Sequence, residues 1–385
     1  MSTTLVKAAP KPLDRHRPAW TSAAHAVGWY AAARLTGLLV TVVAGGGARR
    51  RPPAALGASW DSVHYLSIAA HGYRTWYVTG SGLTYSDLAF FPLYPALIRA
   101  GSAVLPLSPV DTALLISAVA GCVAAWGIHS VVRMVAGPRT ATGVVVLWAL
   151  LPHAVVLTTA YTEALFVALC AWALHALLRE RYPLAGGLAV AAGLTRPSGL
   201  AVVAAVVVAA VLARRDRRAW AGALIAPLGW LAHVAWAGAR TGRPLGYLDI
   251  QAKWGSHFDF GYGTLRFAAH LLLTREEPLF YGAMLVVAAA VVAFVPLVRG
   301  ALRQPGSLPL VLVVYTAVLL ALAVGQTGNW GCKARMLLPA FPLLLPAAAA
   351  LCRARRTAAY ATVTVLAVVS VAYGAYLVVF AGKPL

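Results

Sequence analysis

Acidic residues are scarce in this chain, and charged residues of either sign are few. Charged residues make up 11% of the 385 positions, and only 11 residues are Asp or Glu, against 32 that are Lys or Arg. Hydrophobic residues account for 61%. Apolar runs of about 20 residues recur, which is the length that crosses a hydrocarbon core of about 30 Å. This composition excludes an ordinary soluble protein and indicates a polytopic membrane protein.

Cysteine is also scarce, and the usual cofactor motifs are missing from the sequence. The four cysteines have neither metal-ligand nor disulfide spacing, so they suggest no zinc or redox role. The sequence contains no Walker loop, Rossmann glycine pattern or zinc signature. The net charge of +21 would suggest nucleic acid in a soluble chain. In a membrane protein basic residues collect in cytoplasmic loops, so no nucleic-acid partner is expected.

The apolar runs predict roughly eleven membrane-spanning segments. A cytoplasmic tail at 1–19 precedes a single multi-pass domain at 20–385. The predicted spans are 20–44, 109–132, 140–152, 158–178, 184–195, 197–213, 219–239, 278–299, 308–325, 335–351 and 357–380. With the N-terminus in the cytoplasm, the most basic turns all fall on the cytoplasmic side. We therefore predict a protein of the plasma (inner) membrane in this orientation.

Most polar and acidic residues then fall on the extracytoplasmic face. The largest loops there are 45–108, predicted to contain re-entrant or interfacial helices, and 240–277. Lys and Arg also occur in these loops, against the usual bias. A bound phosphate would explain such cations, because guanidinium and ammonium groups are its natural partners.

The segment WDSVHYLSIAAHGY, residues 60–73, concentrates polar chemistry in an apolar chain. If residues 60–71 are helical, Asp61, His64 and Tyr65 lie on one face. A carboxylate beside an imidazole could take a proton from a hydroxyl or ligate a divalent ion. An amphipathic interfacial helix with an aromatic belt that includes Trp60 would explain the same residues equally well.

Two further carboxylates stand at the edges of apolar segments. Asp87 precedes AFFPLYP, whose two prolines predict a kinked chain, and a structural entry into the membrane is the alternative. Glu163 lies one turn into the apolar helix of TAYTEALF, a costly position unless it is paired. A carboxylate that merely stabilises a helix N-terminus is the alternative for Glu163.

The cations of the outer face occur at breaks in apolar segments. LTRPSGL places Arg196 at a Pro-Gly break between two short helices, where free N–H groups could help to bind an anion. We expect this hairpin to end within the outer half of the membrane. Lys333 and Arg335 begin a late helix, where a phosphate clamp and simple snorkelling are both consistent with the sequence. The loop at 247–263 could form a sugar or head-group wall, or an interfacial surface.

Taken together and in this order, these segments resemble the GPI mannosyltransferase II family and its bacterial relatives, integral-membrane glycosyltransferases of the GT-C fold. The match runs through WDSVHYLSIAAHGY, AFFPLYP, AYTEALF, LTRPSGL, QAKWG and RMLLPAFPLLL. It implies an all-α, GT-C-like bundle that moves mannose from a polyprenyl phosphate to an acceptor hydroxyl at the extracytoplasmic face. Asp61 falls where this class carries its essential aspartate, and Asp87 is the second acidic candidate. The Pro-Ser pair of LTRPSGL departs from the Ser-Asn expected of the family, which leaves the acceptor open.

The chemistry of these residues fits the implied reaction. A lipid-linked sugar phosphate is already activated, so the enzyme needs a general base and cations for the departing phosphate. Direct displacement would invert the anomeric centre. The predicted roles are catalytic for Asp61, His64 and Asp87; phosphate-binding for Arg196, Lys333 and Arg335; and substrate-binding for Trp60, Tyr65, Glu163, Gln251, Lys253, Trp254 and His257. No cofactor is required, although a divalent metal at Asp61 and Asp87 stays open.

Other functions fit parts of the pattern. A transporter or flippase of a lipid-linked sugar would explain broken helices around Arg196, but such proteins place their sites near the midplane between internal repeats, and no repeat is evident. A transferase of the same fold could use a pentose instead of mannose. The expected partners are the membrane, the donor lipid and an acceptor that is a lipid, a glycan or a protein.

Overall fold

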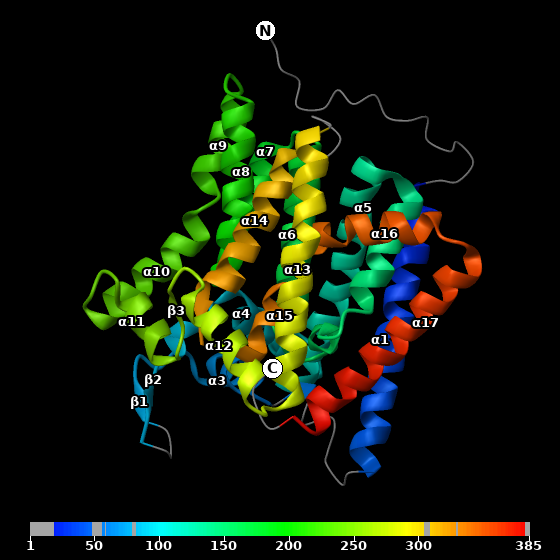
Figure 1. The fold of residues 1–385 in the computed structure, drawn as a ribbon. Helices are drawn as coiled ribbons and strands as arrows, with labels where there is room; N and C mark the ends of the chain where they lie inside the picture. The colour runs from blue at the N-terminus through cyan, green and yellow to red at the C-terminus, as the bar shows by residue number, and fades with distance from the viewer. Residues whose placement is uncertain are drawn as a thin grey trace.

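The computed structural model describes residues 19–47, 56–57, 59–78, 82–303, 309–328 and 330–381. Nearly all of them are helical, and long helices pack side by side into a bundle (Figure 1). The helices that begin before residue 200 are α1 (Ala19–Gly47), α3 (Asp61–His71), α4 (Leu93–Val104), α5 (Pro109–Ala149), α6 (Glu163–Leu178) and α7 (Tyr182–Gly193). The predicted all-α architecture is confirmed. Of the predicted tail at 1–19, residues 1–18 lie outside the described residues.

The second part of the chain is equally helical. Its helices are α8 (Leu200–Leu212), α9 (Arg217–Ile225), α10 (Leu228–Thr241), α11 (Gly246–Lys253), α12 (Tyr262–Leu273), α13 (Pro278–Arg303), α14 (Leu310–Gly325), α15 (Lys333–Met336), α16 (Leu345–Arg353) and α17 (Arg356–Val379). Short 3-10 turns connect them: η1 (Asp87–Ala89), η2 (Ala154–Thr158), η3 (Pro197–Gly199), η4 (Trp330–Cys332) and η5 (Phe341–Leu344).

Several helices are suited to cross a membrane. Within the described ranges five are long and apolar enough: Thr21–Gly46, Pro109–Ala149, Arg217–Thr241, Pro278–Leu302 and Arg356–Val379. A sixth results if the pair Trp330–Met336 and Phe341–Arg353 forms one span, and four shorter apolar helices accompany them. The protein is therefore a multi-pass membrane protein. The predicted number of roughly eleven spans is not confirmed.

Two of the predicted spans correspond to the single long element α5. Gly137 interrupts it with a φ of 82°, a conformation that glycine adopts without strain, and Pro138 follows. This break lies between the predicted spans 109–132 and 140–152. The chain therefore turns where two helix-breaking residues meet.

The predicted span at 335–351 is wrong as one continuous helix. The segment divides into α15, η5 and α16, and its two halves are bent by 75°. Pro339 and Pro342 explain the break, because each removes a backbone donor and clashes with the preceding turn. The bend leaves α15 as a single turn that carries two basic side chains into the interior.

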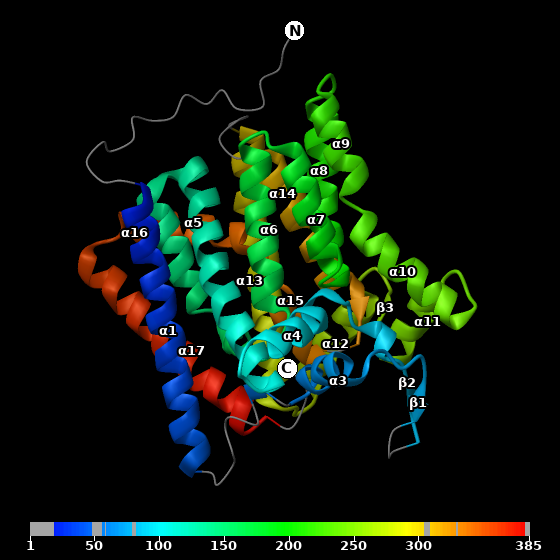
Figure 2. The ribbon, with the colours of Figure 1, turned by 180° about the vertical axis from the view of Figure 1, so that it is seen from behind.

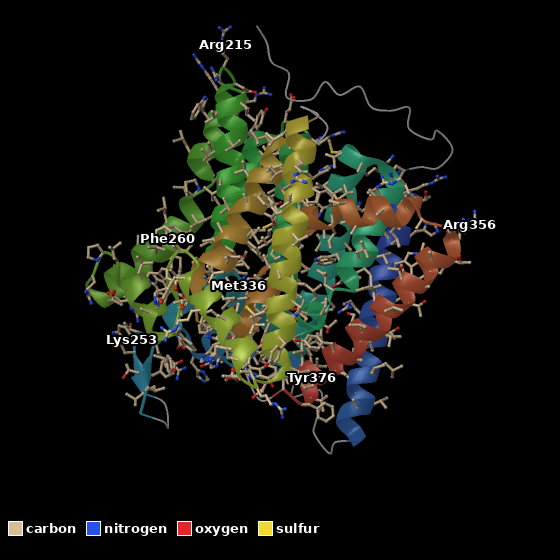
Figure 3. The ribbon with its side chains drawn as sticks, in the orientation of Figure 1. Arg215, Lys253, Phe260, Met336, Arg356 and Tyr376 are labelled. Carbon is tan, nitrogen blue, oxygen red and sulfur yellow. The ribbon has the colours of Figure 1, made fainter. Side chains whose placement is uncertain are left out.

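The bundle has two distinct ends. The turn between α8 and α9, with Arg215 labelled in Figure 3, lies at one end (Figures 1 and 3). The helices α3, α4, α11 and α12 gather toward the other end in both views (Figures 1 and 2). Two antiparallel ladders lie there as well, β1 (Tyr77–Val78) with β2 (Thr84–Tyr85), and β3 (His257–Phe258) with β4 (Gln326–Thr327). The two largest predicted extracytoplasmic loops thus meet at one end.

The hairpin of α7 and α8 ends in η3, whose close backbone contacts require glycine. A Cβ on Gly199 would lie 2.7 Å from Cα and 2.8 Å from N of Gly193, which are backbone atoms that cannot rotate away. The same tip is bonded to the start of α4, because the Leu93 N–H donates to the Leu194 carbonyl at 2.9 Å. The hairpin tip is thus fixed against the helices of the first loop.

We expect Gly199→Ala to destabilise the protein by about 1–3 kcal/mol, the usual cost of forcing an extra carbon into a packed site. Thermal unfolding of the detergent-purified protein would measure this as a lower Tm. Gly187→Ala is the matched control, since a Cβ there meets nothing within 4 Å on the same hairpin. Equal Tm values for both variants would contradict the close contact.

Candidate active site

A cavity of about 310 Å³ lies where the first loop, the α7–α8 hairpin tip, α11, the β3–β4 ladder and α15 meet. The predicted site residues in its wall are Asp61, Tyr65, Arg196, Gln251, Trp254, His257, Lys333 and Arg335. They come from five separate segments of the chain. The fold thus brings together most of the residues that the sequence suggested.

A chain of charged side chains forms the polar wall of this cavity. The Arg335 guanidinium contacts the Asp61 carboxylate at 2.5 Å and the Glu163 carboxylate at 3.5 Å. Arg196 contacts Glu163 at 2.6 Å and donates to the Thr162 hydroxyl at 2.9 Å. Two arginines and two carboxylates therefore alternate, and Glu163 connects the arginines.

Local structure explains where these carboxylates lie. Asp61 is the first residue of α3 and Glu163 is the first residue of α6, so each sits at the positive end of a helix dipole. The Glu163 side chain is 2% exposed, whereas that of Asp61 is 26% exposed. Asp61 is thus the carboxylate that a molecule in the cavity can reach, and Glu163 is the buried anchor.

Lys333 lines the cavity, but its ammonium group already has partners. It donates to the Ala323 carbonyl at 2.9 Å and to the Gln326 carbonyl, and it lies 5.1 Å above the Trp330 ring. These bonds hold α15 against the end of α14 and β4. Lys333 can contribute positive charge to the cavity, while its hydrogen bonds serve the surrounding backbone.

His64 and Asp87 form a second cluster, which does not belong to the cavity wall. The buried Asp87 carboxylate accepts from the Arg74 Nε at 2.8 Å and lies 3.9 Å from the His64 Nδ1. Burial lowers the pKa of His64, and the hydrogen bond to Asp87 raises the pKa of Arg74. His64 stacks on Phe90 at 4.7 Å, and Phe90 does line the cavity. The pair predicted as catalytic therefore lies one layer behind the wall.

The aromatic wall is held in place by bonds between α11 and η1. Gln251 donates to the Ala89 carbonyl at 3.2 Å, and the Trp254 indole donates to the Ser86 carbonyl at 3.2 Å. Trp254 also contacts His64 edge-on at 5.0 Å. These contacts join the two large loops and position the aromatic rings.

Three predicted substrate-binding residues lie outside the cavity wall. Glu163 is the anchor described above, and Trp60 packs against the main hydrophobic core. Lys253 lies 4.4 Å above the Trp76 ring near the edge of the molecule (Figure 3). Conversely, the sequence analysis missed Trp230 and Gln326, which do line the cavity. Trp230 lies in an ordinary apolar helix, and nothing in its local sequence marks it.

Metal binding was left open for Asp61 and Asp87. Each of these carboxylates contacts an arginine instead, Arg335 and Arg74 respectively. Within the part of the chain that the structure describes, no group of three or more His, Cys, Asp or Glu side chains could hold a metal ion. The donors around these two carboxylates therefore do not form a recognisable metal site.

Comparisons with known proteins found one family model that matches part of the chain and several solved structures with a similar fold. The sequence model of the family described as Mannosyltransferase (PIG-V) matches residues 55–213. A search of curated proteins found no match. The fold is similar to that of ArnT from Cupriavidus metallidurans bound to undecaprenyl phosphate, with a TM-score of 0.55 and 16% identity, covering 88% of this chain and 62% of that chain.

A second similar structure comes from an archaeon. It is the oligosaccharyltransferase AglB from Archaeoglobus fulgidus in complex with an inhibitory peptide and a dolichol-phosphate, with a TM-score of 0.51 and 14% identity, covering 93% of this chain and 56% of that chain. This chain thus spans about three fifths of the length of the structures it matches. At such low identity the likeness shows the fold. The predicted resemblance is confirmed, because residues 55–213 match the mannosyltransferase (PIG-V) family and the chain has the fold of the GT-C integral-membrane glycosyltransferases.

Proposed function

We propose that the protein is a glycosyltransferase that moves mannose from a polyprenyl-phosphate donor to an acceptor hydroxyl. The observation that carries this proposal is the convergence of Asp61, Arg196, Lys333 and Arg335 on one cavity. The cavity volume of about 310 Å³ is at the lower end of the range typical of small-molecule sites. The family match and the GT-C fold support the same class of reaction.

The charges of the site suit a phosphodiester donor. Arg196, Lys333 and Arg335 carry three positive charges, and Asp61 with Glu163 carries two negative ones. The single excess positive charge complements the one negative charge of a sugar-phosphate diester. Arginine also matches a phosphate in bidentate geometry, so Arg196 and Arg335 are the direct phosphate ligands of this proposal.

Asp61 acts as the general base. The acceptor oxygen attacks the anomeric carbon, the bond from that carbon to the phosphate oxygen breaks, and the phosphate leaves with the electron pair. The acceptor proton passes to the Asp61 carboxylate, and the sugar inverts its configuration. Arg335, which contacts Asp61, turns toward the phosphate when the donor binds and frees the carboxylate.

The other predicted site residues take supporting roles. Glu163 fixes both arginines, Tyr65, Trp254 and His257 form the sugar-facing wall, and the cluster of Asp87 with His64 holds that wall from behind. No step of the proposed reaction needs a metal ion. We place this end of the bundle on the extracytoplasmic face of the inner membrane and the N-terminus in the cytoplasm, because the α8–α9 turn with its four arginines (214, 215, 217 and 218) lies at the opposite end (Figure 3).

A transfer assay with sided membrane vesicles tests the proposal. Vesicles that contain the protein receive polyprenyl-phosphate-[¹⁴C]mannose and a membrane lipid and protein extract, and radioactivity is followed into new products. Right-side-out vesicles should transfer label and sealed inverted vesicles should not. Polyprenyl-phosphate-arabinose serves as the competing donor. Movement of intact donor across the bilayer without any new labelled product would instead identify a flippase and overturn the proposal.

A further inference from the structure

A second cavity, of about 740 Å³, lies behind the proposed active site. It runs between α13 and α17 and is closed by the bent segment that includes α15 and η5, and by residues 151–153 after α5. Figure 1 shows α13 in front of the bundle and α17 beside it, with both helices reaching the end where the chain terminates. Both helices are long enough to cross the membrane, so this cavity lies at membrane depth.

The wall of this second cavity is suited to hydrocarbon and is open to the bilayer. Ala289, Val286 and Leu343 are typical of its lining, in which Ala, Leu and Val side chains are the majority. Leu285 belongs to the lining and is nevertheless 71% exposed. A lipid chain could therefore enter sideways from the membrane.

One buried polar side chain faces this apolar space without a partner. His153 lines the cavity, is 1% exposed, and has no hydrogen-bond partner on either ring nitrogen among the described residues. Burial and the nearby positive charge of Arg335 both disfavour a protonated ring, so His153 is neutral. A neutral imidazole offers one donor and one acceptor, the pair that a hydroxyl group satisfies. Leaving both unused in the interior is costly.

The charges of the lining select the head group. None of the described lining residues is Lys or Arg, and the remaining titratable groups are Glu276, Tyr281 and Tyr373. Glu276 lies 3.2 Å from the His270 ring. A phosphate head group would find no Lys or Arg in the lining and would meet the Glu276 carboxylate, whereas a neutral polyol would find hydrogen-bond partners. The site therefore favours a neutral, hydroxyl-bearing lipid over an anionic one.

The two cavities share the helical turn α15 as a wall. Lys333, Arg335 and Met336 line the active-site cavity, and Ala334 with Leu337 lines the second one. A lipid head group at His153 is thus separated from the Asp61–Arg335 pair by one turn of helix. The donor phosphate and the second lipid can occupy the protein together.

We propose that the second cavity holds the acceptor, a neutral lipid whose chain lies between α13 and α17 and whose hydroxylated head group binds His153. The role of this lipid as acceptor rests on the proposed function. Its binding in the cavity does not, and can be tested without catalysis. The head group extends past α15 to present its hydroxyl to Asp61.

Photolabelling tests the lipid site directly. The probes are a diacylglycerol and a phosphatidylglycerol that each carry a diazirine in the acyl chain, and mass spectrometry maps the labelled residues on α13 and α17. Ala289→Phe places a phenyl ring in the lining of the cavity, and Ala288→Phe adds the same side chain at the neighbouring position, which is also exposed but lies outside the lining. We expect diacylglycerol to label the wild type and Ala288→Phe, and labelling to be lost in Ala289→Phe. Equal labelling of both variants, or stronger labelling by phosphatidylglycerol, would overturn the inference.

Competition and kinetics then test the role of the bound lipid. Undecaprenyl phosphate should not displace the diacylglycerol label, and displacement would assign the cavity to the donor instead. With a neutral glycosyl-diacylglycerol as the acceptor probe, whose several hydroxyls can serve both His153 and Asp61, His153→Phe should raise the acceptor KM about tenfold, the effect of one lost buried hydrogen bond, and His153→Gln should restore much of it. The donor KM should not change. A wild-type protein that transfers sugar neither to this probe nor to the membrane extract refutes the proposed function, whereas transfer to the extract without labelling of the cavity refutes only this inference.

Discussion

Replacing Asp61 with Asn is expected to lower kcat for sugar transfer by about 10²–10⁴-fold, the contribution typical of a positioned general base. The amide has nearly the same shape as the carboxylate, but it cannot accept the proton of the acceptor hydroxyl. Asp61 is 26% exposed in the cavity wall, so the substitution removes a reachable charge and leaves the packing of α3 intact. Initial rates with labelled donor, compared at equal amounts of folded protein, measure the effect.

The control for this variant changes a carboxylate in the other large loop, at 240–277. Asp249 also pairs with an arginine, Arg243 at 3.1 Å, but its side chain is 43% exposed and does not line the cavity. Asp249→Asn should therefore leave kcat and KM near wild-type values. If Asp61→Asn kept wild-type kcat, the assignment of the base would be wrong, whatever the effect on stability.

Local sequence patterns were enough to predict much of the fold and part of the candidate site. The helix supposed at 60–71 lies at 61–71, the break near Gly137 falls in the gap between two predicted apolar runs, and the break near Arg196 followed from its Pro-Gly sequence. These features depend on neighbours within a few residues, so the sequence displays them directly. The bend between Met336 and Phe341 was missed because the apolar character of the segment outweighed its two prolines.

The pairing of charges could not be predicted in the same way. Asp61 and Arg335 are 274 positions apart, and only the packing of α3 against α15 brings them together. The sequence suggested His64 as the partner of Asp61 because both lie on one helical face. In the structure His64 instead faces Asp87 and Phe90, since η1 and α11 cover that side of α3. Which charged side chains pair depends on segments that are distant in the sequence, and local sequence patterns contain no information about them.

The second large effect is expected for Arg335→Gln, because this guanidinium contacts both Asp61 and the buried Glu163. Loss of a charged donor to the departing phosphate should lower kcat by about 10²–10³-fold. Removal of one partner from a buried charge network should also lower the free energy of unfolding by about 3–5 kcal/mol. Arg335→Lys keeps the charge, but one ammonium cannot span both carboxylates as a planar guanidinium does. The kcat and the free energy of unfolding of this variant should therefore lie between those of the wild type and of Arg335→Gln.

A double variant separates the structural effect from the catalytic one. Arg335→Gln combined with Glu163→Gln removes the unpaired buried carboxylate, so much of the lost thermal stability should return. The kcat should stay low, since no guanidinium at position 335 then meets the phosphate. Thermal unfolding and initial rates are measured on the same four proteins of the mutant cycle. Recovery of kcat together with Tm in the double variant would show that Arg335 only neutralises Glu163, and the phosphate would then have to be bound by Arg196 and Lys333.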